Sequence, residues 1–197
     1  MKRALFSAGL LAAAALAGAQ PEPPPSMAPQ GLQSALRDVG FDQRLGESLP
    51  LDVSLRDEAG REVRLGDFFG RRPVVLSLVY YECPMLCTLT LNGLTSALGV
   101  LSFDPGKEFE LVTVSFDPKD TPELAAAKKK TYLARYQRPA AQAGWHFLTG
   151  TREAIARITT AAGFRYAWDA ETKQFAHPSG ILVATPEGKI ARYLYGI

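Results

Sequence analysis

The two cysteines of the chain, Cys83 and Cys87, are the residues whose type and spacing most directly indicate chemistry. They follow an apolar run at 74–80 and stand four positions apart, with Pro84 at a suitable first position of a helix. This pattern predicts a buried strand that delivers both thiols to the first turn of a helix. Side chains four residues apart share a helix face, and the amides of a helix N-terminus favour thiolate over thiol.

Two thiolates that converge on one point can cycle with a disulfide or bind a soft metal ion. A structural disulfide across one helical turn would close a very small loop and restrain little of the unfolded chain, so it is the weaker interpretation. A metal site needs a third ligand, and the chain has two histidines. His146 lies within a predicted strand, which favours a side chain on the sheet surface or edge. His177 lies in a loop before a strand, where functional residues often gather. Two thiolates and an imidazole suit copper better than zinc, which lacks a fourth ligand here.

The elements around these residues alternate between strand and helix patterns. This order predicts a central parallel sheet with helices on both faces, to which a final hairpin adds antiparallel strands. Thr121 and Pro122 fit the N-cap and first position of one helix. The predicted strands are 51–55, 62–65, 74–80, 109–115, 144–148, 164–168, 174–176, 181–184 and 189–195, and the predicted helices are 84–98, 122–137 and 151–163.

The 197 residues, 47% of them hydrophobic, suit one globular domain with accessory segments. Residues 1–19 have the pattern of a signal peptide, which predicts a periplasmic or other extracytoplasmic protein. An uncleaved N-terminal anchor, which would hold the domain near a membrane, is the alternative. Residues 20–48 are predicted to form a Pro-rich linker and N-terminal extension, and residues 49–197 the domain.

The formal charge is +2, and the lysines at 128–130 are interpreted as a solvated helix face, so no nucleic-acid partner is expected.

Three motifs together resemble the Sco/SenC family, whose thioredoxin-fold copper proteins help to assemble cytochrome c oxidase. The most specific motif is Cys83-Pro84-Met85-Leu86-Cys87 after an apolar strand. The second is the segment 115–122, with its Asp-Pro and Asp-Thr-Pro elements, and the third is His177 before a strand and a Pro-x-Gly turn at 186–188. The resemblance extends from about Leu49 to Ile197.

The resemblance implies a thioredoxin-like α/β fold, in which helices flank a central mixed sheet between an N-terminal β-hairpin and a closing C-terminal hairpin. It implies that Cys83, Cys87 and His177 bind copper, as Cu(I) or Cu(II), and that the cysteines form a redox-active pair. The implied partner is cytochrome c oxidase subunit II, or another copper or thiol protein, whose copper centre is loaded or whose thiols are kept reduced.

The sequence departs from the family pattern in two places. Ala176 stands where the family often has an acidic residue, which would orient the imidazole. Family members also continue into a C-terminal helix, so a chain that stops at Ile197 is expected to be a short variant or a fragment, with one sheet face thinly covered.

Other functions compete with that of a copper chaperone, which would not itself be an enzyme. The main alternative is a thiol-disulfide oxidoreductase of the thioredoxin superfamily without stable metal binding. Peroxiredoxin chemistry is disfavoured because Tyr80 replaces the required threonine, and a structural zinc module lacks a fourth ligand. Asp117 and Asp120 are interpreted as turn and helix-capping residues, and Met85 as a packing or docking residue.

Overall fold

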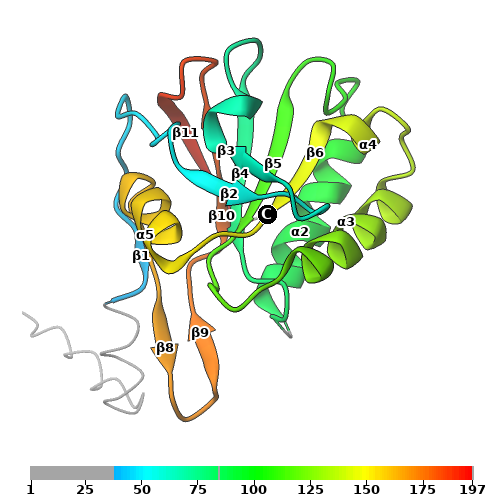
Figure 1. The fold of residues 1–197 in the computed structure, drawn as a ribbon. Coiled ribbons are helices and arrows are strands. Elements are labelled where there is room, and N and C mark those ends of the chain that lie inside the picture. The colour runs from blue at the N-terminus through cyan, green and yellow to red at the C-terminus, as the bar shows by residue number, and fades with distance from the viewer. Residues whose placement is uncertain (1–37, 84, 197) are drawn as a thin grey trace, which may run out of the picture.

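The computed structural model describes residues 38–83 and 85–196. The predicted signal peptide, most of the predicted linker and Pro84 therefore lie outside the described residues. The elements are arranged as Figure 1 shows. They are β1 (Gly40–Phe41), β2 (Ser54–Arg56), β3 (Glu62–Arg64), the 3-10 helix η1 (Leu65–Phe68), β4 (Val74–Val79), α2 (Leu86–Gly99), β5 (Glu110–Ser115), α3 (Pro122–Tyr136), α4 (Ala141–Gly144), β6 (Trp145–Leu148), α5 (Arg152–Ala161), β7 (Phe164–Arg165), β8 (Ala167–Asp169), β9 (Gln174–Ala176), β10 (Gly180–Ala184) and β11 (Ile190–Tyr195).

A five-stranded mixed sheet forms the centre of the domain, with the strand order β11-β10-β4-β5-β6. The strands β4, β5 and β6 are parallel, whereas β10 is antiparallel to both β4 and β11. This arrangement confirms the predicted parallel core and the antiparallel closing hairpin. None of the helices within the described residues is long and apolar enough to cross a membrane.

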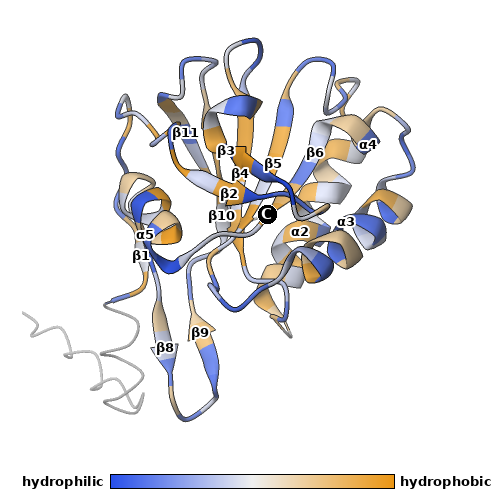
Figure 2. Ribbon diagram, viewed as in Figure 1, coloured by the Kyte–Doolittle hydropathy of each residue, from blue (hydrophilic) through white to orange (hydrophobic). Residues whose placement is uncertain are grey.

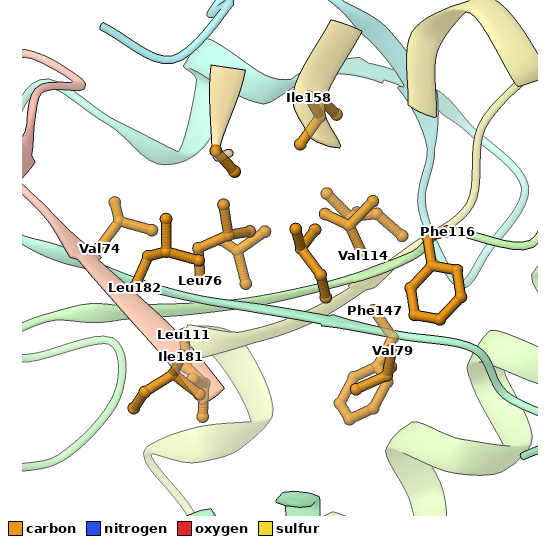
Figure 3. Close-up of a cluster of buried hydrophobic side chains, with 14 of the residues drawn as sticks. Val74, Leu76, Val79, Leu111, Val114, Phe116, Phe147, Ile158, Ile181 and Leu182 are labelled. Atoms are coloured by element: carbon orange, nitrogen blue, oxygen red, sulfur yellow. The ribbon is translucent and has the colours of Figure 1, made fainter. Parts of the chain in front are cut away.

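Side chains alternate across this sheet and fill two apolar layers. In Figure 3, Leu76, Val114 and Leu182 point to the side of the sheet where Ile158 of α5 lies, while Leu111 and Phe147 point to the other side. Tyr132 of α3 stacks on Phe147 with ring centroids 6.4 Å apart, so α3 covers that second side. The central strands are correspondingly hydrophobic (Figure 2). Burial on both faces explains why the strand at 74–79 reads as a continuous apolar run.

Leu76 offers a direct test of this core. It is fully buried, and Leu76→Ala should lower the free energy of unfolding by about 2–5 kcal/mol, because it removes buried methyl groups and leaves a cavity. Leu45→Ala is the matched control, since Leu45 is 56% exposed and its substitution should change the free energy of unfolding little. Urea denaturation of both variants measures the difference. Equal stability of the two would contradict the assigned core.

The structure extends the domain before residue 49. The short strand β1, within the segment assigned to the linker and extension, pairs with β7, and the backbone N–H of Asp42 donates to the carbonyl of Gly163 at 2.8 Å. Gly163 has φ +60°, and a Cβ there would lie 1.9 Å from the Asp42 carbonyl oxygen, so this contact requires glycine. The strand β1 and helix α4 were not predicted, because elements of two to four residues show no periodicity.

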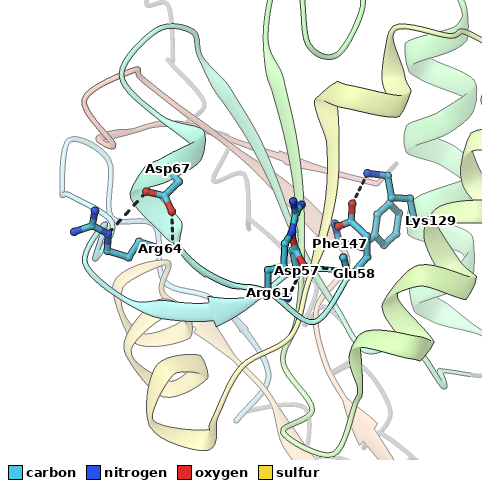
Figure 4. Close-up of polar contacts among 8 residues, drawn as sticks. Asp57, Glu58, Arg61, Arg64, Asp67, Lys129 and Phe147 are labelled. Carbon is cyan, nitrogen blue, oxygen red and sulfur yellow. Dashed lines mark hydrogen bonds and ion pairs between the residues drawn. The ribbon is translucent and has the colours of Figure 1, made fainter.

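The β2–β3 hairpin is fixed to the edge of the sheet by charged groups (Figure 4). The Glu58 carboxylate pairs with Lys129 of α3 at 2.5 Å and accepts the backbone N–H of Phe147 in the edge strand β6 at 3.3 Å. Asp57 holds the hairpin turn by accepting the backbone N–H groups of Ala59 and Arg61, each at 2.9 Å. Lys129 is therefore buried and paired, and the prediction that all three lysines at 128–130 are solvated is wrong for this one.

Candidate metal and thiol site

Strand pairing brings the predicted ligands together. The strand β10 runs antiparallel to β4, with Ile181 opposite Ser77, so the loop that enters β10 lies beside the carboxyl end of β4. That loop contains His177, and the segment that leaves β4 contains Cys83 and Cys87. The sheet order therefore places an imidazole from late in the chain next to two thiols from its middle.

The three donor atoms of Cys83, Cys87 and His177 all lie within 4.8 Å of one another. The side chains are buried, with exposed fractions of 6%, 2% and 7% respectively. The shortest contact joins Cys87 Sγ and His177 Nε2 at 3.1 Å. The two cysteines are not joined by a disulfide in the structure. The chemistry of this donor set fits a soft metal ion, since two sulfurs and an imidazole nitrogen are the groups that such ions prefer.

The orientation of the imidazole is set by the backbone. His177 Nδ1 lies 3.0 Å from the carbonyl oxygen of Pro178, and because a carbonyl only accepts hydrogen bonds, Nδ1 must carry the proton. The lone pair of Nε2 is then directed to the Cys87 sulfur. This carbonyl takes the role that the sequence analysis assigned to an acidic residue at position 176, so Ala176 does not leave the ring unoriented.

The two sulfurs differ in charge. Hydrogen bonding from Cys87, and from the backbone N–H groups of Cys87 and Met85, lowers the pKa of Cys83 to about 3, although burial acts in the opposite direction. Burial is the main cause that raises the pKa of Cys87, followed by its interaction with Cys83. Cys83 is accordingly the thiolate of the pair and Cys87 the protonated thiol.

The start of helix α2 differs from the prediction. The helix begins at Leu86, with Met85 as its N-cap, whereas the prediction began it at residue 84, directly after Cys83. Met85 offers no side-chain cap, and the Cys83 sulfur instead accepts the backbone N–H of Cys87 at 3.2 Å. The backbone N–H of Tyr80 donates in turn to Cys87 Sγ at 3.3 Å. The predicted convergence of the thiols at a helix N-terminus holds, with Cys83 acting as the capping acceptor.

Three aromatic rings pack around the imidazole. The ring of His177 lies 5.2 Å from that of Phe116, 5.9 Å from that of Tyr80 and 6.4 Å from that of Phe164, measured between centroids. The hydroxyls of Thr90 in α2 and Ser179 in the His177 loop are 2.9 Å apart and hydrogen bond, which ties this loop to the cysteine-bearing helix. Phe116 and Phe164 could not be assigned to the site from the sequence, because nothing in their local pattern points to residue 177.

Comparison with known proteins identifies the family. The SCO1/SenC family model matches residues 42–196. The chain belongs to the SCO1/SenC family.

Individual proteins and solved structures are also similar to this chain. A Stutzerimonas stutzeri protein named for copper binding is 27% identical over 124 residues, which are 61% of this chain and 56% of that protein. A crystal structure of an Aquifex aeolicus VF5 protein named for electron transfer has 32% identity and a TM-score of 0.69, and the match covers 78% of this chain and 86% of that one. Copper-bound ScoI of Arabidopsis thaliana has 20% identity and a TM-score of 0.61, with 77% and 88% covered. The predicted thioredoxin-like fold is confirmed.

The other candidate residues of the sequence lie around or away from this SCO1/SenC site. Met85 is 66% exposed beside the cysteines. His146 lies apart from them on the edge strand β6, with its ring 4.4 Å from that of Phe68 and its Nε2 3.5 Å from Glu110. Asp117 accepts the backbone N–H of Lys119 at 2.9 Å, which is the predicted turn.

Asp120 does not cap helix α3, contrary to the prediction, because Thr121 fills that place. The Asp120 carboxylate is buried and accepts the backbone N–H of Tyr81 at 2.6 Å and the hydroxyl of Ser115 at 2.5 Å. Burial raises the pKa of this carboxyl, while these two hydrogen bonds act against the rise. Asp120 thus joins the segment that leads into Cys83 to the end of β5.

We expect Asp120→Leu to destabilise the protein by roughly 1–3 kcal/mol or more, because it leaves the buried N–H of Tyr81 without an acceptor. Asp120→Asn keeps an oxygen acceptor and removes the buried charge, so its free energy of unfolding should fall much less. Urea unfolding of both variants measures the difference. If both variants are equally stable, these hydrogen bonds do not hold the cysteine segment.

Proposed function

We propose that this protein binds copper through Cys83, Cys87 and His177 and delivers it to another copper protein. The observation that carries this proposal is the buried cluster of three soft donor atoms within 4.8 Å. Membership of the SCO1/SenC family supports it, as does the Stutzerimonas stutzeri relative named for copper binding.

The protonation of the three groups fits the capture of a metal cation. Cys83 already carries negative charge, and the Nε2 lone pair of His177 is available because Nδ1 is protonated. Cys87 must lose its proton for its sulfur to act as a thiolate ligand, so binding releases protons and weakens as pH falls. Copper is the cargo in this scheme, and it leaves with the acceptor.

We further propose that the acceptor is the binuclear copper centre of cytochrome c oxidase subunit II and that the protein works outside the cytoplasm. The Sco/SenC resemblance supports this identity of the acceptor. The signal-like pattern of residues 1–19 supports the location and, if the segment is retained, a position close to a membrane.

Thiol-disulfide exchange is the second candidate function, and the charge difference between the sulfurs favours it. The Cys83 thiolate would attack a partner disulfide, which forms a mixed disulfide and releases one partner thiolate. Cys87, after losing its proton, would attack the Cys83 sulfur of that bond and release the second partner thiolate. The partner disulfide is then reduced to two thiols, and Cys83 and Cys87 are oxidised to a disulfide.

Copper binding is tested by titrating the reduced protein with Cu(I) against a competing chelator. We expect one tightly bound ion per chain, and weak binding in Cys83→Ser and Cys87→Ser. Equal affinity of the wild type and both variants would exclude this site.

The two functions are separated by mixing the protein with the metal-free soluble domain of oxidase subunit II. If copper delivery is correct, the copper-loaded protein should produce the absorbance of the binuclear centre in the acceptor. If thiol exchange is correct, the reduced metal-free protein should reduce an oxidised acceptor without copper. Mass spectrometry of the acceptor thiols measures the second outcome.

A further inference from the structure

A groove of about 480 Å³ lies between helices α2 and α3, which are neighbours in Figure 1. We call it the α2–α3 groove. On the α2 side it is lined by Thr88, which directly follows Cys87, and by Asn92 one turn further on. On the α3 side it is lined by a stripe of side chains three or four positions apart, which therefore share one helix face. The stripe consists of Leu124, Lys128, Thr131 and Arg135.

The α2–α3 groove adjoins the turn of α2 that carries Cys87. The ring of Tyr132 lines the groove, and its hydroxyl donates to the backbone carbonyl of Thr88 at 3.4 Å. Met85 and Leu89, at the start of α2, are both exposed, so the same turn also presents apolar side chains to solvent. A protein bound in the groove would therefore lie beside the thiol site.

The charge of the groove has one sign. Lys128 and Arg135 line it, and none of its lining residues in the described part of the chain is an aspartate or glutamate. The charged groups of these two residues make no ion pair or hydrogen bond with any described residue, whereas the adjacent Lys129 pairs with Glu58. Two unpaired cations beside the apolar surface of Leu124 and Tyr132 are complementary to carboxylates that flank an apolar side chain.

We propose that the α2–α3 groove is a docking surface for the acceptor protein, and that it binds an acidic segment of the acceptor that carries an apolar side chain. The apolar side chain packs against Leu124 and Tyr132, and the carboxylates pair with Lys128 and Arg135. That the occupant is the acceptor rests on the proposed function, whereas the preference for an acidic segment rests on the groove alone.

The groove is tested first with a synthetic peptide in which glutamates flank one leucine. In ¹H–¹⁵N spectra of the reduced metal-free protein, we expect the peptide to shift the amide signals of the groove residues. Lys128→Glu combined with Arg135→Glu should weaken binding about tenfold, because two attractions become repulsions. Lys130→Glu combined with Lys189→Glu is the matched control, since it changes the net charge equally at two exposed lysines outside the groove, and its affinity should stay close to that of the wild type.

The second measurement is the rate of copper transfer to the metal-free soluble domain of oxidase subunit II. We expect the groove variant to bind Cu(I) as tightly as the wild type but to transfer it about tenfold more slowly at low salt, and the control variant to match the wild type. If the wild type transfers no copper to this domain, the proposed acceptor fails, and the peptide titration alone still decides what the groove binds.

Three results would overturn the inference. The first is a peptide that leaves the groove signals unshifted or binds the groove and control variants equally. The second is binding to phosphatidylglycerol vesicles that only the groove variant loses, without peptide binding, which would assign the groove to lipid. The third is a dimer, seen by sedimentation, that only the groove variant abolishes, which would assign the groove to a second copy of the chain.

Discussion

His177→Ala is expected to weaken Cu(II) binding by more than about 100-fold, because the loss of a direct ligand should exceed the 10–100-fold cost of losing a supporting group. It should also abolish the thiolate-to-copper charge-transfer absorbance, since the imidazole is the donor that suits the harder Cu(II) ion. Cu(I) binding should fall less, because both sulfurs remain. Competition titrations with each oxidation state and visible spectra measure these effects.

His146→Ala is the matched control for this experiment. It removes the second histidine of the chain, which lies on β6 beside Phe68 and Glu110 and outside the donor cluster. Its Cu(II) affinity and spectrum should match those of the wild type. Unchanged affinity and absorbance in His177→Ala, or equal losses in the two variants, would remove His177 from the ligand set.

The alkylation of Cys83 is expected to be almost independent of pH between pH 5 and pH 8. Its pKa of about 3 means that the thiolate is already fully formed throughout this range. An ordinary thiol with a pKa of about 8.5 reacts roughly tenfold faster per pH unit below that value, or nearly 1,000-fold over the same interval. Iodoacetamide labelling followed by peptide mass spectrometry measures the rate at each cysteine separately.

Substitution of Cys87 provides the control for this prediction. The Cys87 thiol is the largest cause of the low pKa of Cys83, so Cys87→Ala should raise that pKa and restore part of the pH dependence. Cys83→Ser should remove the fast reaction, because the remaining Cys87 is buried and protonated. A wild-type rate that rises tenfold per pH unit would show that Cys83 is an ordinary thiol.

The regular elements of the fold could be predicted because their signals are local. Thr121 caps α3 through a hydrogen bond from Leu124 N–H, and Pro122 begins that helix as its sequence position indicated. The N-terminus of α2 was misplaced because its capping acceptor is the sulfur of Cys83, a residue type that sequence rules for caps do not include. Elements as short as β1 depend on a distant partner strand and leave no periodic pattern.

The site itself was predictable only in part. The spacing of Cys83 and Cys87 indicated two convergent thiols, but the choice of His177 as their partner came from the family resemblance. Their proximity depends on β10 pairing with β4, and such pairing between distant segments is not determined by local propensity. The role of Asp120 was missed for the same reason, since its partner Tyr81 lies 39 residues away in the chain.

The position of β10 beside β4 also determines when the site can form. His177 follows Cys87 by 90 residues, so a chain synthesised from its N-terminus presents both thiols long before the imidazole exists. The three donors meet only after the last hairpin has closed onto the first central strand. A metal ion captured earlier would have two sulfur ligands and no nitrogen. Binding through all three proposed ligands would therefore require the completed sheet.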